Sequence, residues 1–129
     1  ANFSPDGTKI VTASSDGTTK VWDWETGEVL LTLGHGVYVQ SANFSPDGTK
    51  IVTASFYGIA KVWNAETGQE LSTLRHDGEV NSANFSPDGT KIVTASRYGT
   101  TVKVRDAENG QELLTLRHDR RVTSANFSP

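Results

Sequence analysis

One block of sequence, ANFSPDGTKIVTAS, occurs unchanged at residues 1–14, 42–55 and 83–96, and its first five letters return at 125–129. The copies begin 41, 41 and 42 residues apart. A fixed period of about 20 to 50 residues is typical of repeat architectures, in which each unit buries its apolar surface against its neighbours. Folding alone does not require such identity, because cores accept exchanges between side chains of similar volume. The identity therefore indicates recent duplication or deliberate design.

Each period contains four short segments rich in Val, Ile, Thr and aromatic residues, separated by turn residues, which is the pattern of an antiparallel meander. In the second period we expect strands a, b, c and d at 39–44, 50–55, 59–63 and 70–74. Strand b carries apolar or small side chains on both faces, as expected for a sheet that is covered on both sides. A four-stranded sheet stacked between copies of itself is a propeller blade. The sequence thus predicts an all-β chain with three blades, in units 1–41, 42–82 and 83–124, followed by an extra start of strand a at 125–129.

Three motifs resemble those of a known family of repeat proteins. His35 and His76 precede strand a, FSPDG connects strands a and b, and Trp22-Asp23 ends strand c. In motif order and period the whole chain resembles the WD-repeat (WD40) β-propeller family, and in particular a three-blade fragment of a highly repetitive, recently amplified bacterial propeller. The resemblance implies a rigid scaffold that binds other molecules, usually proteins, and that is seldom an enzyme.

The resemblance also implies a buried hydrogen-bonded set in each blade, made by a His before strand a, a Ser or Thr on strand b, an Asp in the b–c turn and a Trp on strand c. Carried over by position, the predicted structural set is Ser14, Asp16, Trp22 and His118 in the first blade, His35, Ser55 and Trp63 in the second, and His76 and Ser96 in the third. Tyr57 and Tyr98 stand where Asp is expected, and Arg105 stands where Trp is expected. A buried network that loses a member leaves a partner unsatisfied, at a cost of about 1–3 kcal/mol. The third blade is therefore predicted to be the weakest.

The third unit is also one residue longer, because Val102 is extra. A single inserted residue requires a β-bulge or a longer loop, since a slip by one residue would send every following side chain to the wrong face. We expect a bulge near Thr100 to Val102. A buried guanidinium is costly without a partner, so Arg105 should reach solvent or pair with Asp106 or another carboxylate. These two departures favour one alternative fold, a strand-swapped all-β dimer that is not a propeller.

Composition excludes several functions. There is no cysteine, which removes disulfides and thiolate chemistry, and no apolar run long enough to span a membrane. The net charge of −3 is opposite to the footprint of a typical nucleic-acid binder. The histidines recur once per blade, too far apart to share a metal ion, and no catalytic set recurs with them. We therefore expect no enzyme activity, no metal and no cofactor, with the cytoplasm as the default location because the chain opens without signal-peptide features.

Differences between the copies gather on one side. The a–b and c–d turns should emerge on one rim of the stack (the turn rim), and the b–c and d–a loops on the other (the loop rim). The turn rim repeats SPDGT three times, whereas the loop rim varies and carries aromatic and Arg side chains, which are enriched in binding hot spots. Unselected drift of exposed loops would also place differences there. The candidate interaction residues on this rim are Tyr38, Phe56, Tyr57, Glu79, Arg97, Tyr98, Arg120 and Arg121.

Three blades are too few for a propeller, because known propellers close with about four to eight. Strand a occurs once more at 122–127 and would complete the first blade of a neighbouring chain. We expect head-to-tail assembly into a ring, as a dimer with six blades or a trimer with nine. The formal charges of the three units are −3, −2 and +2, so a positive end would meet a negative beginning.

Three functions stay open at this point. The first is a non-enzymatic scaffold for protein–protein interaction, with itself and an unidentified protein or peptide as partners and no membrane. The second is an engineered or decayed propeller fragment with a purely structural role and no ligand. The third is nucleic-acid binding, which is disfavoured by the acidic charge and would use Arg97, Arg117, Arg120 and Arg121.

Overall fold

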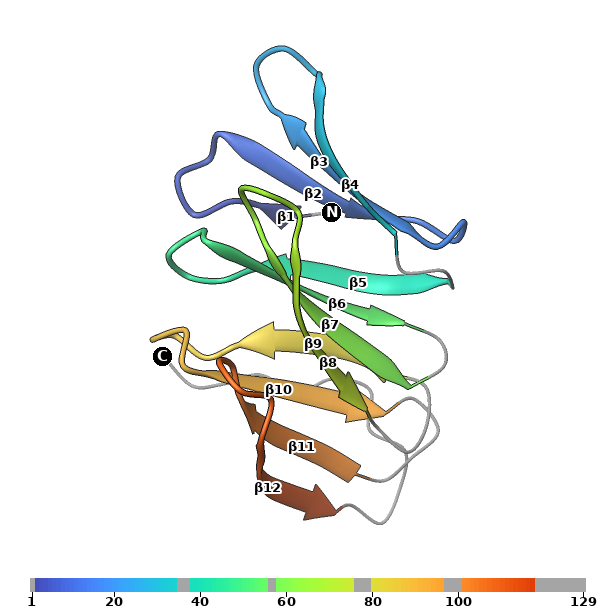
Figure 1. Cartoon of the computed structure of the whole chain (residues 1–129), viewed down its shortest axis with the longest axis vertical. Coiled ribbons are helices and arrows are strands. Elements are labelled where there is room, and N and C mark those ends of the chain that lie inside the picture. The colour runs from blue at the N-terminus through green and yellow to red at the C-terminus, as the bar shows by residue number, and fades with distance from the viewer. Residues whose placement is uncertain (1, 35–37, 56–57, 76–79, 97–100, 118–129) are drawn as a thin grey trace.

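The computed structural model describes residues 2–34, 38–55, 58–75, 80–96 and 101–117, and within these ranges all regular structure is β-strand. The strands form three four-stranded antiparallel sheets that are stacked one above another (Figure 1). Blade one comprises β1 (Asn2–Phe3), β2 (Lys9–Ala13), β3 (Thr18–Asp23) and β4 (Val29–Gly34). Blade two comprises β5 (Val39–Phe44), β6 (Lys50–Ser55), β7 (Ile59–Asn64) and β8 (Glu70–Arg75). Blade three comprises β9 (Val80–Phe85), β10 (Lys91–Ser96), β11 (Thr101–Asp106) and β12 (Glu112–Arg117).

The prediction of three propeller blades is confirmed. Each sheet is built from four consecutive strands of the chain. In blade two the first two predicted strands have the observed bounds, and the last two each extend one residue further. Figure 1 also shows the a–b and c–d turns on one side of the stack and the ends of strands b and d on the other, as predicted for the two rims.

The turns follow directly from the turn residues. In the SPDG turn of blade two, the Gly48 amide donates to the Ser45 carbonyl at 2.9 Å, and Gly48 has a φ of 75° that favours glycine. In the c–d turn the Asn64 side chain accepts hydrogen bonds from the backbone amides of Glu66 and Thr67, at 2.8 and 3.0 Å. Both turns are local, so each copy of the sequence closes its hairpins in the same way.

The cores lie between the blades, not within one sheet. Each junction joins two faces that we name by direction. The trailing face of a blade faces the next blade along the chain, and the leading face contacts the previous blade. The junction of blades one and two buries the trailing-face residues Val11, Val21 and Leu33 against the leading-face residues Ala42, Ile51, Trp63 and Ala65, with Phe44 packed beside them.

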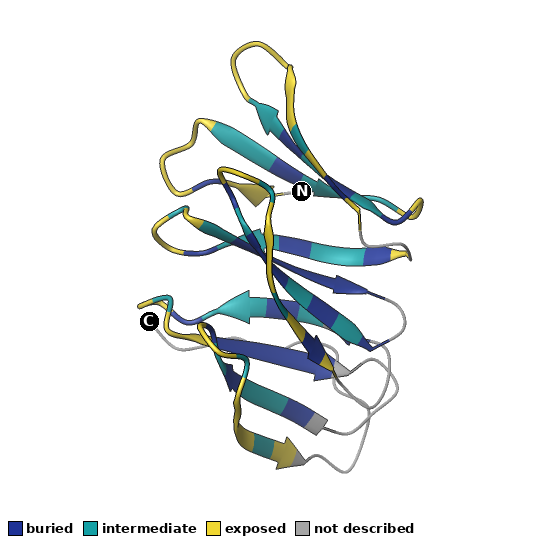
Figure 2. Ribbon diagram, in the orientation of Figure 1, coloured by how far each residue is buried: buried dark blue, intermediate teal, exposed yellow. Residues whose placement is uncertain are grey.

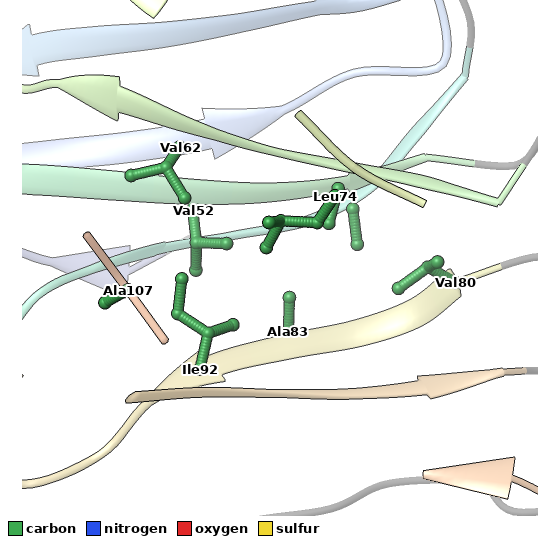
Figure 3. Packing of buried hydrophobic residues seen from close by; sticks show 9 residues of the cluster. Val52, Val62, Leu74, Val80, Ala83, Ile92 and Ala107 are labelled. Atoms are coloured by element: carbon green, nitrogen blue, oxygen red, sulfur yellow. The ribbon is translucent and has the colours of Figure 1, made fainter. Parts of the chain in front are cut away.

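The second junction uses the same positions. Figure 3 shows Val52, Val62 and Leu74 of blade two pointing toward Ala83 and Ile92 of blade three. Ile51 and Ile92 occupy the same leading-face position in successive blades, and both are fully buried. Asparagine bridges reinforce the stacking, because Asn2 Nδ2 donates to the Ala42 carbonyl and Asn43 Nδ2 to the Ala83 carbonyl, each at 2.8 Å. Repeated residues therefore make repeated junctions.

The extra residue in blade three does not produce the expected bulge. Val102 pairs with Ala95 and Asp106 with Lys91, and no register shift occurs between β10 and β11. The strands β10 and β11 are instead separated by four residues, 97–100, where three separate β6 from β7. Thr100 lies outside the described residues. The prediction of a bulge at 101–102 is therefore wrong, because a longer loop preserves the facing of every side chain in β11.

The sequence repeat is offset from the sheets. The unit borders at 41/42 and 82/83 fall inside the inner strands β5 and β9, whereas the sheets divide at the loops after β4 and β8. The additional strand a expected at 122–127 lies outside the described residues. In the described part of blade one the inner strand is short, since β1 pairs only two residues with β2.

Candidate interaction surfaces

The tryptophans of strand c are bonded within their own blade to threonines of strand b, not to the serines that we expected. Trp22 Nε1–H donates to Thr12 Oγ1, and Trp63 Nε1–H donates to Thr53 Oγ1, each at 3.0 Å. Register explains the choice. Trp22 lies opposite Ile10 in the sheet, so the side chain two residues further along β2, Thr12, shares its face. Alternation alone also places Ser55 on the face of Thr53, so the register, in which Trp63 lies opposite Ile51, is what selects the threonine.

The predicted serines and aspartate have other partners. Ser55 Oγ donates to the Ile59 carbonyl at 2.9 Å, which closes the start of β7. Asp16 accepts hydrogen bonds from the Thr18 amide and hydroxyl at 2.9 and 2.6 Å, and its own amide donates to Ser14 Oγ. The Thr18 hydroxyl, the Ser14 side chain and the Thr18 amide lower the pKa of Asp16. These groups therefore stabilise the b–c turn of blade one. His35, His76 and His118 lie outside the described residues, and the side chain of Ser96 is not described.

Blade three lacks the indole, and its absence leaves buried atoms without partners. Arg105 occupies the position of Trp63 and is 9% exposed. Its Nη2 donates to the Arg75 carbonyl in blade two, but its Nε has no partner among the described residues. Thr94 Oγ1, the counterpart of Thr53 Oγ1, also has no partner there. We expected Arg105 to reach solvent or to pair with Asp106 or another carboxylate, but the side chain is buried and no ion pair with Asp106 is found among the described residues. Its hydrogen bond goes to a backbone oxygen, although its charge also lowers the pKa of the Glu112 carboxyl, after larger effects of Lys103 and Thr115.

The a–b turns of the turn rim have the same hydrogen bonds in every blade. In blade one the Ser4 and Thr8 hydroxyls donate to Asp6 Oδ1 at 2.7 and 2.8 Å, and the Thr8 amide donates to the same oxygen at 3.0 Å. The hydrogen bond from Ser4, followed by those from Thr8, lowers the pKa of Asp6 to about 2. The equivalent groups hold the pKa of Asp47 at about 2 and that of Asp88 well below its usual range. This rim therefore presents three identical, internally satisfied turns.

The loop rim is described in part. Tyr38 is 48% exposed at the entrance to β5, and the next residue, Val39, donates its amide to the Ser14 carbonyl at 3.2 Å. That hydrogen bond joins the connection between blades one and two to the b–c turn of blade one. The other candidates on this rim lie outside the described residues, namely Phe56, Tyr57, Glu79, Arg97, Tyr98, Arg120 and Arg121.

Two kinds of feature are absent from the described ranges. Within these ranges no three His, Asp or Glu side chains are grouped as ligands for a metal ion. The same part of the chain contains no helix with the length and apolar character needed to cross a membrane. Among the arginines of the nucleic-acid hypothesis, Arg97, Arg120 and Arg121 lie outside the described ranges, and the side chain of Arg117 is not described.

A comparison with protein families decides the identity of the repeats. The family model for the WD domain, G-beta repeat, matches residues 1–23, 27–64 and 68–106. The chain belongs to the WD40 repeat family. No curated protein was found that matches it.

The WD40 matches are offset from the blades in a regular way. The second match runs through β4 to β7, and the third runs through β8 to β11. The second and third repeats thus each supply the outer strand of one blade and the three inner strands of the next, which links neighbouring blades covalently. WD40 repeat domains are generally scaffolds for protein interaction and are typically not enzymes. The interaction surfaces available to this chain are therefore the two rims and the faces of the blades.

Proposed function

We propose that this WD40 chain is a non-enzymatic scaffold that binds a protein or peptide through its loop rim. The contrast between the two rims carries the proposal. On the turn rim the same hydrogen-bonded network of Ser, Asp and Thr is built three times. On the loop rim the copies differ, with Ser15-Asp16 replaced by Phe56-Tyr57 and then by Arg97-Tyr98. Aromatic and Arg side chains are those that dominate binding energy at protein interfaces.

The described side chain on this rim supports the same view. Tyr38 is a large aromatic residue with nearly half of its surface exposed, whereas Trp22, Phe44, Trp63 and Phe85 are at least partly buried. An exposed aromatic ring supplies a large contact area at little entropic cost when a partner covers it. The proposal therefore places Tyr38 beside the variable loops as part of one recognition surface.

The test requires a partner and a matched control. Proteins captured from a cell extract by the immobilised chain would be identified and purified, and their binding measured by calorimetry. Joint replacement of Phe56, Tyr57, Arg97 and Tyr98 by Ala is expected to weaken binding at least about 100-fold, because hot-spot residues cost 2 kcal/mol or more each. The control replaces the exposed turn-rim residues Glu25, Glu66 and Glu108 by Ala. Equal affinities for the wild-type chain and the loop-rim variant would contradict the proposal.

A further inference from the structure

The two ends of the stack carry uncovered copies of the surfaces that form the internal junctions. On the trailing side, Leu33 and Leu74 are 2% and 3% exposed because the next blade covers them. Leu116 has the same position in blade three and is 45% exposed, and its neighbour on the same face, Leu114, is 51% exposed. Figure 2 shows this exposure along β12 at one end of the stack. The trailing face of blade three is therefore apolar and carries the same positions that are covered at the internal junctions.

The leading side of blade one shows the complementary exposure. Phe44 and Phe85 pack into the two internal junctions, whereas Phe3, at the same position, is 58% exposed. Trp24 is 57% exposed and packs edge-to-face against Phe3 with ring centroids 5.8 Å apart. An exposed aromatic pair of this kind is a typical interface anchor. Blade one therefore begins with an apolar leading face.

The contacts of the c–d turn glycines indicate what kind of surface fits on the leading face of blade one. A Cβ built on Gly68 would lie 3.3 Å from Leu33 Cδ2, and one built on Gly110 would lie 2.9 Å from Leu74 Cδ2. At both internal junctions the outer-strand leucine thus presses on the turn glycine of the next blade. The equivalent Gly27 has no atom within 4 Å of such a Cβ. By analogy with Gly68 and Gly110, Gly27 would be contacted by a leucine on the trailing face of another blade. In blade three the leucine at that position is Leu116.

The junctions are also directional. Asn2 and Asn43 each donate to a backbone carbonyl of the following blade, so every junction joins a trailing face to a leading face. Charge follows the same direction, since unit 83–124 has a formal charge of +2 and unit 1–41 has −3. A repeated trailing-to-leading contact closes a ring when its rotation allows.

We propose that the trailing face of blade three packs on the leading face of blade one in a second copy of this chain, with Leu114 and Leu116 against Phe3 and Trp24. The junction extends the internal stacking across chains, so that two copies complete a ring of six blades or three copies a ring of nine. Trp24 distinguishes this junction from the internal ones, which carry the smaller residues Ala65 and Ala107 at the same position. The proposal does not depend on the loop rim, because the residues that carry it lie on the faces of the strands and in the c–d turns.

The test uses light scattering after size-exclusion chromatography of the 129-residue chain and three variants. The wild-type chain is expected to have two or three times the mass of 13.9 kDa. Leu116→Glu places a charge on the trailing face, and Trp24→Glu places one on the leading face; each variant is expected to have the mass of one chain. Leu113→Glu is the control on the same strand, because its counterparts Leu30 and Leu71 stay 42% and 43% exposed beside internal junctions. It is expected to assemble like the wild-type chain.

Mixing separates this contact from any other mode of assembly. The Trp24→Glu chain keeps its trailing face and the Leu116→Glu chain keeps its leading face, so an equimolar mixture is expected to form a 1:1 dimer that neither chain forms alone. Circular dichroism of each variant checks that the β-sheets are intact. A wild-type mass of one chain, an unchanged mass in both face variants, or a mixture that stays monomeric with intact sheets would each overturn the proposal.

Discussion

Replacing Arg105 with Trp tests the account of how the blades are held together. In blade two, Trp63 donates its indole N–H to Thr53 Oγ1 and fills the junction with blade one. In blade three the same register position carries Arg105, and the counterpart hydroxyl of Thr94 has no described partner. Arg105→Trp should restore the missing hydrogen bond and fill the junction with an apolar ring.

The magnitude follows from the groups that gain and lose partners. Thr94 Oγ1 regains a donor, and the unpaired Arg105 Nε is removed. Against this, the Arg75 carbonyl loses its hydrogen bond from Nη2. An unsatisfied buried polar group costs about 1–3 kcal/mol, so two gains against one loss predict a net stabilisation of about 1–3 kcal/mol.

The assay is equilibrium unfolding in urea, followed by circular dichroism at a fixed chain concentration. With an m-value of about 1–3 kcal/mol/M, the variant should raise the midpoint by roughly 1 M. Threonine-to-valine replacements, combined with Arg105→Trp, form a double-mutant cycle that isolates the indole–threonine hydrogen bond. Thr94→Val should stabilise the wild-type chain by about 1–3 kcal/mol, because it removes a buried hydroxyl that has no described partner, and should cost about 1 kcal/mol in the Arg105→Trp chain. Thr53→Val should cost about 1 kcal/mol because Trp63 loses its acceptor.

Two results would refute the reasoning. One is a lower midpoint for Arg105→Trp, which would mean that the guanidinium stabilises blade three more than an indole can. The other is a Thr94→Val effect of the same size with and without Trp at position 105. Either result would show that the indole–threonine bond is not the common device of the blades.

Two further predictions concern the turns. Because hydrogen bonds hold the pKa of Asp47 at about 2, below its ordinary 3.8, its contribution to stability is complete above pH 3.8 and is lost as the pH falls through 2. Asp47→Asn should therefore flatten the loss of stability between about pH 5 and 2 in acid titrations followed by circular dichroism, with Glu66→Gln as the control; an unchanged slope would contradict this. Gly110→Ala should lower the free energy of unfolding in urea by about 1 kcal/mol more than Gly27→Ala does. Both glycines have a positive φ, but only at Gly110 would the new Cβ lie against Leu74. Equal losses of stability would show that the junction has room to relax.

The strands were predictable because each copy carries its own turn chemistry. The bounds of β5 and β6 agree with the sequence prediction, since SPDG and the alternation of Val, Ile and Thr fix them locally. Identical copies then made the other blades predictable as well. The stacking order also followed from the sequence, because strand b is apolar on both faces and requires a neighbour on each side.

The polar partners were less predictable because they depend on sheet register. The family pattern pointed to Ser14 and Ser55, whereas the indoles donate to Thr12 and Thr53, which share their face. The destination of Arg105 depends on the path of β8 in the adjacent blade, which presents a backbone oxygen there. Such contacts between blades follow from the stacking geometry, which no single copy of the sequence specifies.

The position of the extra residue was ambiguous for a related reason. A bulge and a longer loop both keep the side chains of β11 on their proper faces, and the sequence does not distinguish the two. The unbroken pairing from Val102 to Asp106 decides for the loop. All the candidate interaction residues on the loop rim stay predictions, and Tyr38 is the one among them whose exposure the structure describes.

The central claim is that the end faces of the three-blade stack complete each other between copies of the chain. Electron microscopy of the purified chain tests it most directly, because face views of a propeller allow its blades to be counted. The account predicts closed rings with six or nine blades and a uniform spacing between them. Open particles with three blades, or pairs of stacks joined through two trailing faces, would contradict it.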